Sequence, residues 1–123
     1  MSVKILYRDL TEKIIKCFYN VYNELGGGFL ESVYENSLTI EFESIGLSFE
    51  SQKNINVFYK NDLVGEFIAD MVVDNKILIE IKAVSILSPL HKAQLINYLR
   101  ATGIKVGLLV NFGNKLEFKR VIY

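Results

Sequence analysis

Cysteine, histidine, proline and tryptophan are scarce in this chain of 123 residues, which has one cysteine, one histidine, one proline and no tryptophan. A single cysteine, Cys17, excludes an internal disulfide bond. One cysteine and one histidine also exclude a zinc site built from these residue types. Cys17 falls within the apolar stripe of a predicted helix, so we interpret it as a small core residue rather than a reactive thiol.

Long hydrophobic runs are also lacking. Glu80 and Lys82 interrupt the most apolar segment, so no stretch reaches the length of a membrane span. The first residues, 1–9, lack the apolar run of a signal peptide. We therefore expect a cytoplasmic protein with no membrane partner. The length suits a single domain over residues 1–123, and a composition that is 50% hydrophobic is sufficient for one core.

The chain also lacks a net charge, because 14 basic residues balance 14 acidic ones. The two signs are not evenly distributed. Residues 1–50 carry 4 basic and 8 acidic side chains, whereas residues 82–123 carry 7 basic and 1 acidic. A basic C-terminal third is typical of a surface that attracts phosphate, although a solvated face with a local charge bias explains the same pattern.

Apolar periodicity predicts the order helix, helix, three strands, helix, two strands. Helices are expected from about Leu10 to Leu25, from near Leu30 to Gly46, and from Pro89, capped by Ser88, to Thr102. Strands are expected over about residues 55–59, 63–73, 76–84, 105–111 and 116–122. The first three strands should form an antiparallel meander. The fold class is therefore α/β, with a mixed five-stranded sheet flanked by helices in the order ααβββαββ.

Two charged residues lie within the most apolar predicted strand, Ile77–Val84. Glu80 and Lys82 point to one face of it, because strand side chains alternate. Asp70 occupies a similar place in the preceding strand, and the intervening turn at Asp74 sets it opposite residue 79 or 80. An unpaired buried charge costs several kcal/mol. Either Glu80 and Lys82 form a structural ion pair, or the charges open onto a functional site.

The functional interpretation is a metal site. Mg²⁺ prefers oxygen ligands and retains several waters, so carboxylates at Asp70 and Glu80 would hold it and leave room for a phosphate. A nearby lysine would orient the attacking water and add positive charge to the transition state. Lys82 satisfies that requirement. A buried Glu80–Lys82 pair is the competing explanation, although such pairs often fail to recover their desolvation cost.

Helical residues suggest further members of the site. Glu31 lies in the first turn of the second helix, where capping alone would explain a carboxylate, and Tyr34 and Glu35 share its face. Three preceding glycines, residues 26–28, indicate a close backbone approach to another element rather than a simple linker. In the helix after Pro89, Gln94 and Tyr98 lie on one side, within reach of a lysine, a water or a phosphate.

The single histidine, His91, falls on the same side of that helix as Gln94 and Tyr98. A catalytic base would have to face the pocket. We interpret His91 instead as a surface histidine or one whose hydrogen bonds are already satisfied.

The segment Leu25–Glu35, read LGGGFLESVYE, resembles the signature of the GxxExxY family, with Gly28, Glu31 and Tyr34 at the named positions. Four later segments are similar to that family too, so the resemblance covers nearly the whole chain: 69–73, 79–84, 91–99 and 107–113. The family is placed in the PD-(D/E)XK nuclease-like superfamily, whose restriction-endonuclease-like core has the element order predicted above.

The resemblance implies functional residues at Glu31, Asp70, Glu80 and Lys82, with the three carboxylates as metal ligands. A Gln-x-x-x-Tyr pair after the lysine strand is similar to that of RecB-type exonucleases, which implies supporting roles for Gln94 and Tyr98. Tyr34 is assigned to the same supporting group. The position before Asp70 is Ala69, where the superfamily name has proline.

The favoured hypothesis is a nuclease that uses Mg²⁺, with Mn²⁺ as a substitute, to hydrolyse nucleic acid, DNA being favoured over RNA. A short chain offers little surface with which to hold a duplex, so a homodimer is a further hypothesis. Two alternatives remain open at this point. One is a nucleic-acid-binding module that does not cleave, and the other is a protein-interaction module on the same fold.

Overall fold

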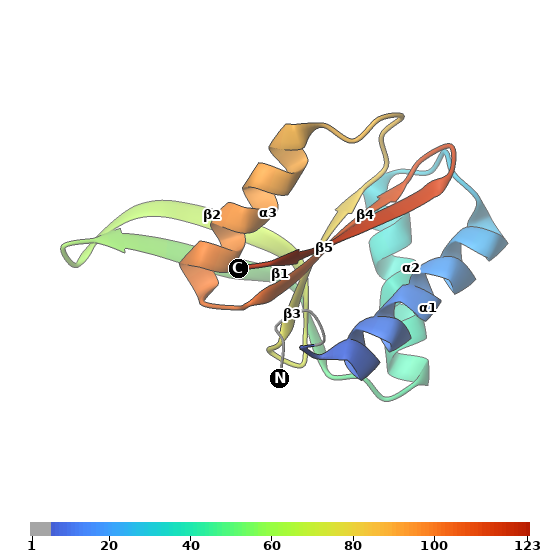
Figure 1. Ribbon diagram of the computed structural model, residues 1–123, viewed down its shortest axis with the longest axis horizontal. Coiled ribbons are helices and arrows are strands. Elements are labelled where there is room, and N and C mark those ends of the chain that lie inside the picture. The colour runs from blue at the N-terminus through green and yellow to red at the C-terminus, as the bar shows by residue number, and fades with distance from the viewer. Residues whose placement is uncertain (1–5) are drawn as a thin grey trace.

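The computed structural model describes residues 6–123, which form three helices and one five-stranded sheet (Figure 1). The elements in chain order are α1 (Arg8–Leu25), α2 (Glu31–Ser44), β1 (Phe49–Tyr59), β2 (Asp62–Val73), β3 (Ile77–Lys82), α3 (Pro89–Thr102), β4 (Val106–Phe112) and β5 (Leu116–Ile122). The predicted order ααβββαββ is confirmed.

The sheet has the strand order β1-β2-β3-β4-β5. Only β3 and β4 pair in parallel, because α3 connects them as a crossover, and the other three pairings are antiparallel. The predicted mixed sheet and the β1–β2–β3 meander are therefore confirmed. The prediction for β1 was too short: the strand begins at Phe49, not near Ile55. Polar residues dominate its first half, and that half is held by backbone pairing with β2 rather than by an alternating apolar face.

Helices cover both faces of the sheet, so the molecule has three layers (Figure 1). α1 and α2 pack on one face through a core that includes Ile14, Phe18, Leu38, Ile79 and Ile81. α3 packs on the other face through a smaller core that includes Leu95, Leu99, Leu78, Val72 and Leu109. The hairpin of β1 and β2 extends beyond the layers, alongside α3.

The α3 side of the sheet begins with a well-defined helix start. The Ser88 side chain accepts a hydrogen bond from the N–H of Leu90, and His91 Nδ1 accepts one from the N–H of Ser88 at 3.1 Å. Pro89 occupies the first helical position, where a missing N–H costs nothing. The predicted cap is confirmed, and His91 is a satisfied histidine, as expected.

The glycines between α1 and α2 meet the β4–β5 turn. A Cβ added at Gly27 would lie 2.3 Å from the carbonyl oxygen of Gly113, and the Tyr22 hydroxyl donates to that same oxygen at 2.8 Å. No side chain fits at such a distance, so the prediction of a close backbone approach is confirmed for Gly27. The contact fixes the chain immediately before α2.

Substituting Gly27 by alanine should lower the free energy of unfolding by about 1–3 kcal/mol, because the new Cβ would collide with backbone that cannot move alone. Gly65→Ala is the control. A Cβ there would meet the ring edge of Phe67 at 3.2 Å, and that side chain can rotate. Urea denaturation of both variants measures the difference. Equal losses at the two positions would contradict the proposed contact.

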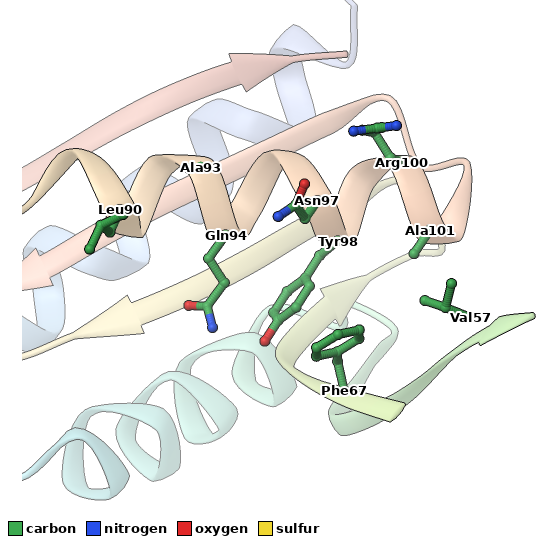
Figure 2. Close-up of a pocket in the computed structure, with 9 residues that line it drawn as sticks. All are labelled: Val57, Phe67, Leu90, Ala93, Gln94, Asn97, Tyr98, Arg100 and Ala101. Carbon is green, nitrogen blue, oxygen red and sulfur yellow. The ribbon is translucent and has the colours of Figure 1, made fainter. Parts of the chain in front are cut away.

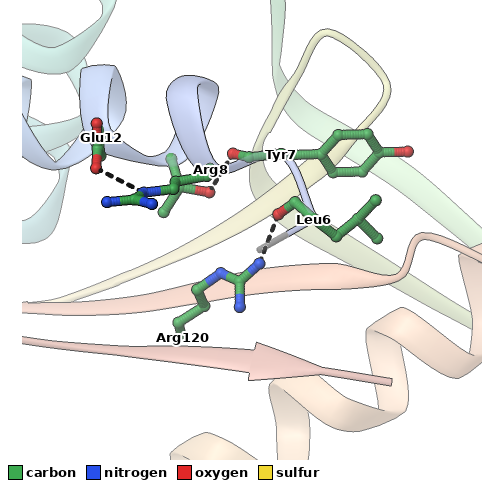
Figure 3. A network of polar contacts seen from close by, with 6 residues as sticks. Leu6, Tyr7, Arg8, Glu12 and Arg120 are labelled. Atoms are coloured by element: carbon green, nitrogen blue, oxygen red, sulfur yellow. Dashed lines mark hydrogen bonds and ion pairs between the residues drawn. The ribbon is translucent and has the colours of Figure 1, made fainter. Parts of the chain in front are cut away.

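The start of α1 is attached to the last strand. Arg120 of β5 donates a hydrogen bond to the carbonyl oxygen of Leu6, and Arg8 pairs with Glu12 along the helix at 3.2 Å (Figure 3). The carbonyl oxygen of Tyr7 accepts the N–H and the hydroxyl of Thr11. These contacts hold α1 across the sheet. In residues 6–123, no helix has the length and apolar character needed to cross a membrane.

Candidate active site

The strands β2 and β3 separate at the two carboxylates singled out in the sequence. Their ladder pairs Val73 with Ile77 and continues to Met71 and Ile79, where it ends. Beyond that point, the N–H of Asp70 donates to Glu80 Oε2 at 2.9 Å, and the N–H of Ile81 donates to Asp70 Oδ2 at 2.7 Å. Each carboxylate therefore replaces a backbone partner on the opposite strand, which places both carboxylates in the opening between the strands.

Strand alternation breaks at Asp70. Met71 packs with the α1–α2 core, yet Ala69 and Val72 both pack with the α3 core, whereas strict alternation would put Ala69 on the same face as Met71. The break leaves Asp70 half-buried, between the two faces. Because Asp70 lies between the two faces, residues from both helical layers can reach its carboxylate.

Gln52 of β1 accompanies this break, and the sequence analysis missed it. Its φ is +53°, in the left-handed region, and the β1–β2 ladder pairs Ser51 and Lys53 but not Gln52 itself. Such backbone costs about 1–3 kcal/mol and persists only where other contacts impose it. Gln52 Nε2 donates to Glu35 Oε1 at 2.7 Å, and its side chain also opposes the rise in the pKa of Asp70. The residue thus connects α2 to the carboxylate pair.

Glu80 is the most deeply buried charged group in the site, with 3% of its surface exposed. Burial, and then the nearby carboxylate of Asp70, raise the pKa of Glu80 to about 8. The N–H of Asp70 and the charge of Lys82 oppose that rise without cancelling it. Burial also raises the pKa of Asp70, again against the hydrogen bond from Ile81 and the charge of Lys82. The negative charge of the carboxylates in the site therefore exceeds the positive charge that Lys82 supplies.

Lys82 follows Glu80 on the same face of β3 and acts on both carboxylates through its charge. Within the part of the chain that the structure describes, the close ion pairs are Arg8–Glu12, Lys53–Glu50 and Lys76–Asp74, and none involves Lys82. The structural alternative required a Glu80–Lys82 ion pair, and the side chains do not form one. Lys82 is half-buried beside the carboxylates instead.

Glu31 begins α2 and is exposed, as a first-turn carboxylate should be. Its charge contributes to raising the pKa of Asp70, of Glu80 and of Glu35. Glu31 of α2 therefore acts through its charge on Asp70 of β2 and Glu80 of β3, but among the described residues the three side chains do not form a group arranged to hold a metal ion. Burial is the largest cause of the raised pKa of Glu35, which is the neighbour noted on the face of Glu31.

Tyr34 lies in the core, away from solvent. Its hydroxyl donates to the carbonyl oxygen of Gly26 at 2.7 Å and accepts the N–H of Phe29 at 3.2 Å. Its ring stacks on Phe112 with centroids 4.4 Å apart. Tyr34 therefore fixes the glycine loop that leads into α2 and Glu31.

Tyr98 of α3 lies close enough to the carboxylates for their charges to act on it, and Gln94 is exposed one turn earlier on the same helix. Burial, followed by the charges of Glu80 and Asp70, raises the pKa of Tyr98, while a hydrogen bond from Gln94 opposes the rise. The charges of both carboxylates therefore act on the Tyr98 hydroxyl. Figure 2 shows Gln94 and Tyr98 extending from the same side of α3.

Asn111 holds the end of β3 in place. This buried residue of β4 accepts the N–H of Val84 on Oδ1 at 2.9 Å and donates from Nδ2 to the Val84 carbonyl at 2.8 Å. Its side chain imitates a strand partner just beyond Lys82. A polar residue within the apolar run of β4 was the available sequence signal, comparable to Glu80 in β3.

The carboxylates provide hard oxygen donors that suit a divalent cation. Across residues 6–123, no group of three or more His, Cys, Asp or Glu side chains stands ready to hold a metal ion. Mg²⁺ does not require such a group, since one or two carboxylates with waters and substrate phosphate are its usual ligands. Asp70 and Glu80 each use one oxygen in the strand contacts and keep a second one. A cation there would also offset the crowded negative charge, so the residues fit Mg²⁺.

Comparison with known proteins agrees with this geometry. A model of the PD-(D/E)XK nuclease superfamily matches residues 8–121, and the chain therefore belongs to that superfamily. No curated protein matches the sequence. A solved structure described as the crystal structure of SSO0001 has 19% sequence identity and a TM-score of 0.59. The alignment covers 98% of this chain and 60% of that one, so this chain spans about 60% of the length of SSO0001, and the likeness shows the fold.

Proposed function

We propose that the protein is a Mg²⁺-dependent nuclease that hydrolyses phosphodiester bonds in nucleic acid, with Mn²⁺ as a substitute metal. The observation that supports this most directly is the exchange of hydrogen bonds between Asp70 and Glu80 at the open end of the β2–β3 ladder. This exchange holds the two carboxylates together next to a lysine, whose positive charge offsets part of their negative charge. Asp70 and Glu80 would bind the cation, with Glu31 as the third carboxylate.

Bound Mg²⁺ would supply Lewis-acid stabilisation of charge on the phosphate and lower the pKa of the attacking water. Lys82 would orient that water and place its positive charge beside the phosphate as negative charge builds there. Tyr98 and Gln94 would donate hydrogen bonds to the phosphate from the α3 side. Asn111 and Gln52 would keep the strands that carry these groups in position.

The basic C-terminal third supports nucleic acid as the partner, since residues 82–123 carry 7 basic and 1 acidic side chains. DNA is the first polymer to test, with RNA as its comparison. Membership of the GxxExxY family within the superfamily, and assembly into a homodimer, also belong to this proposal. Sedimentation at several protein concentrations tests the dimer.

Incubation of the purified protein with labelled single-stranded and duplex DNA and RNA tests the proposal. We expect cleavage in Mg²⁺ and in Mn²⁺ and none in EDTA, because the carboxylates alone cannot stabilise charge on the phosphate. Binding that persists without cleavage in either metal would instead identify a non-cleaving nucleic-acid-binding module. Neither binding nor cleavage would leave the protein-interaction alternative.

A further inference from the structure

A groove of about 640 Å³ lies between α3 and the β1–β2 hairpin (Figure 2). Its walls combine apolar and polar side chains from both elements: Val57, Phe67, Leu90, Ala93, Gln94, Asn97, Tyr98, Arg100 and Ala101. The groove is open to solvent on the side away from the core, and its size admits a planar ring system. The nuclease chemistry proposed above gives a role to Gln94 and Tyr98 but none to the rest of the groove.

Two aromatic rings form one end of the groove. Phe67 of β2 and Tyr98 of α3 lie with centroids 5.7 Å apart and planes inclined by 43°. Phe67 is 45% exposed, so a large part of its ring faces water rather than protein. Figure 2 shows it below the Tyr98 ring, on the same side as Val57. Tyr98 itself is buried, so it supports the Phe67 ring from behind, and the exposed face of Phe67 is a surface on which a nucleobase can stack.

Polar groups lie along the helix side of the same groove. The amides of Gln94 and Asn97 each offer a donor and an acceptor, the combination that pairs with the edge of an unpaired base. Arg100 lies near the end of α3, with its guanidinium turned away from Phe67 in Figure 2. That placement suits a phosphate that runs along the outside of the groove. The chemistry of the lining is therefore complementary to a nucleotide.

Tyr98 connects the groove to the proposed metal site. Its ring lies against Phe67, and the charges of Glu80 and Asp70 help to raise the pKa of its hydroxyl. A base stacked on Phe67 would therefore place a neighbouring phosphate toward the carboxylates.

We propose that this groove binds an unpaired base next to the cleaved phosphate, which makes single-stranded nucleic acid the substrate class. The inference rests on the proposed nuclease function for the meaning of the adjoining site. A base in a duplex has both faces stacked and its pairing edge occupied, so it cannot enter.

Fluorescence anisotropy with a labelled single-stranded DNA oligonucleotide in EDTA, where no cleavage is expected, tests the proposal. Wild-type protein should bind it at least about tenfold more tightly than the matching duplex. Phe67→Ala should lower single-strand affinity about tenfold or more, as removal of a stacking partner does. Ile68→Ala is the matched control, since Ile68 is the neighbouring residue, similarly exposed, and does not line the groove. It should bind like wild type.

An oligonucleotide series with one abasic position moved along the strand gives an independent readout. Wild type should lose affinity at one position, and Phe67→Ala should be insensitive to it. Equal affinity for duplex and single strand, or an unaltered Phe67→Ala variant, would overturn the inference even if the protein cleaves DNA. Phe67-dependent single-strand binding without cleavage in Mg²⁺ would support the groove and refute the nuclease. A Phe67→Ala variant that changes only self-association would overturn the groove as a base site.

Discussion

Replacing Lys82 by alanine should lower the rate of Mg²⁺-dependent cleavage by roughly 10²–10⁴-fold, the range typical of a group that assists proton transfer. Lys82 is half-buried beside Asp70 and Glu80 and forms no close ion pair in residues 6–123. Its positive charge lowers the pKa of both carboxylates, so its removal also costs some folding free energy, and the rates must be compared for folded protein. Asp70→Asn should be at least as inactive, because an amide cannot neutralise a cation, while its oxygen still accepts the N–H of Ile81.

Lys76→Ala is the matched control for Lys82. Lys76 lies on the same hairpin, at its exposed turn, and pairs with Asp74 at 3.3 Å outside the site. This variant should cleave at the wild-type rate, and circular dichroism should show all three variants folded. Full activity in folded Lys82→Ala would remove the lysine from the mechanism. Full activity in Asp70→Asn would remove the proposed metal site.

The second large effect is a loss of stability with rising pH in metal-free protein. Glu80 has a folded-state pKa of about 8 and an ordinary value of 4.5, so the folded state binds the proton more tightly than the unfolded state. This contribution is complete below the unfolded pKa and is lost as the pH rises through 8. The loss is on the order of a few kcal/mol. In EDTA, the Tm should therefore fall between pH 5 and pH 9.

Glu80→Gln should remove most of that pH dependence, since the amide does not titrate and its oxygen still accepts the N–H of Asp70. The raised pKa of Asp70 has the same sign and leaves a smaller slope. Glu50→Gln is the control, because Glu50 is exposed and pairs with Lys53 outside the site. It should keep the wild-type slope. If Glu80→Gln kept the wild-type dependence of Tm on pH, Glu80 would be ionised in the folded protein at little cost in stability.

Most of the fold follows from local signals in the sequence. Ser88 and Pro89 define the start of α3, and Gly103 defines its end, because each of these residues suits one backbone position. The meander follows from turns at Asn61 and Asp74, both at positive φ. The first half of β1 was missed because no face of it is consistently apolar. This half forms a strand because it pairs with β2, and a local sequence pattern does not reveal such pairing.

The candidate site was predictable where charge conflicts with an apolar setting. Asp70, Glu80 and Lys82 stand out for that reason, and the predicted register placed Asp70 opposite residue 79 or 80. Gln52 and Phe67 gave no such signal, because both lie on an exposed hairpin where polar and aromatic residues are common. The break in strand alternation at Asp70 could not be predicted from the sequence either. It arises because carboxylate side chains on β2 and β3 take the place of backbone hydrogen-bond partners.

The glycine loop constrains how Glu31 could reach the proposed cation. Gly27 contacts the β4–β5 turn through backbone alone, and Tyr34 bonds to Gly26 and Phe29 on either side. The amino end of α2 is thereby anchored, so the helix cannot slide toward the strands. Rotation about the side-chain bonds of Glu31 is the remaining route. Loading the ion would then need a rotamer change rather than a domain movement, and crystals of the empty protein should tolerate soaking.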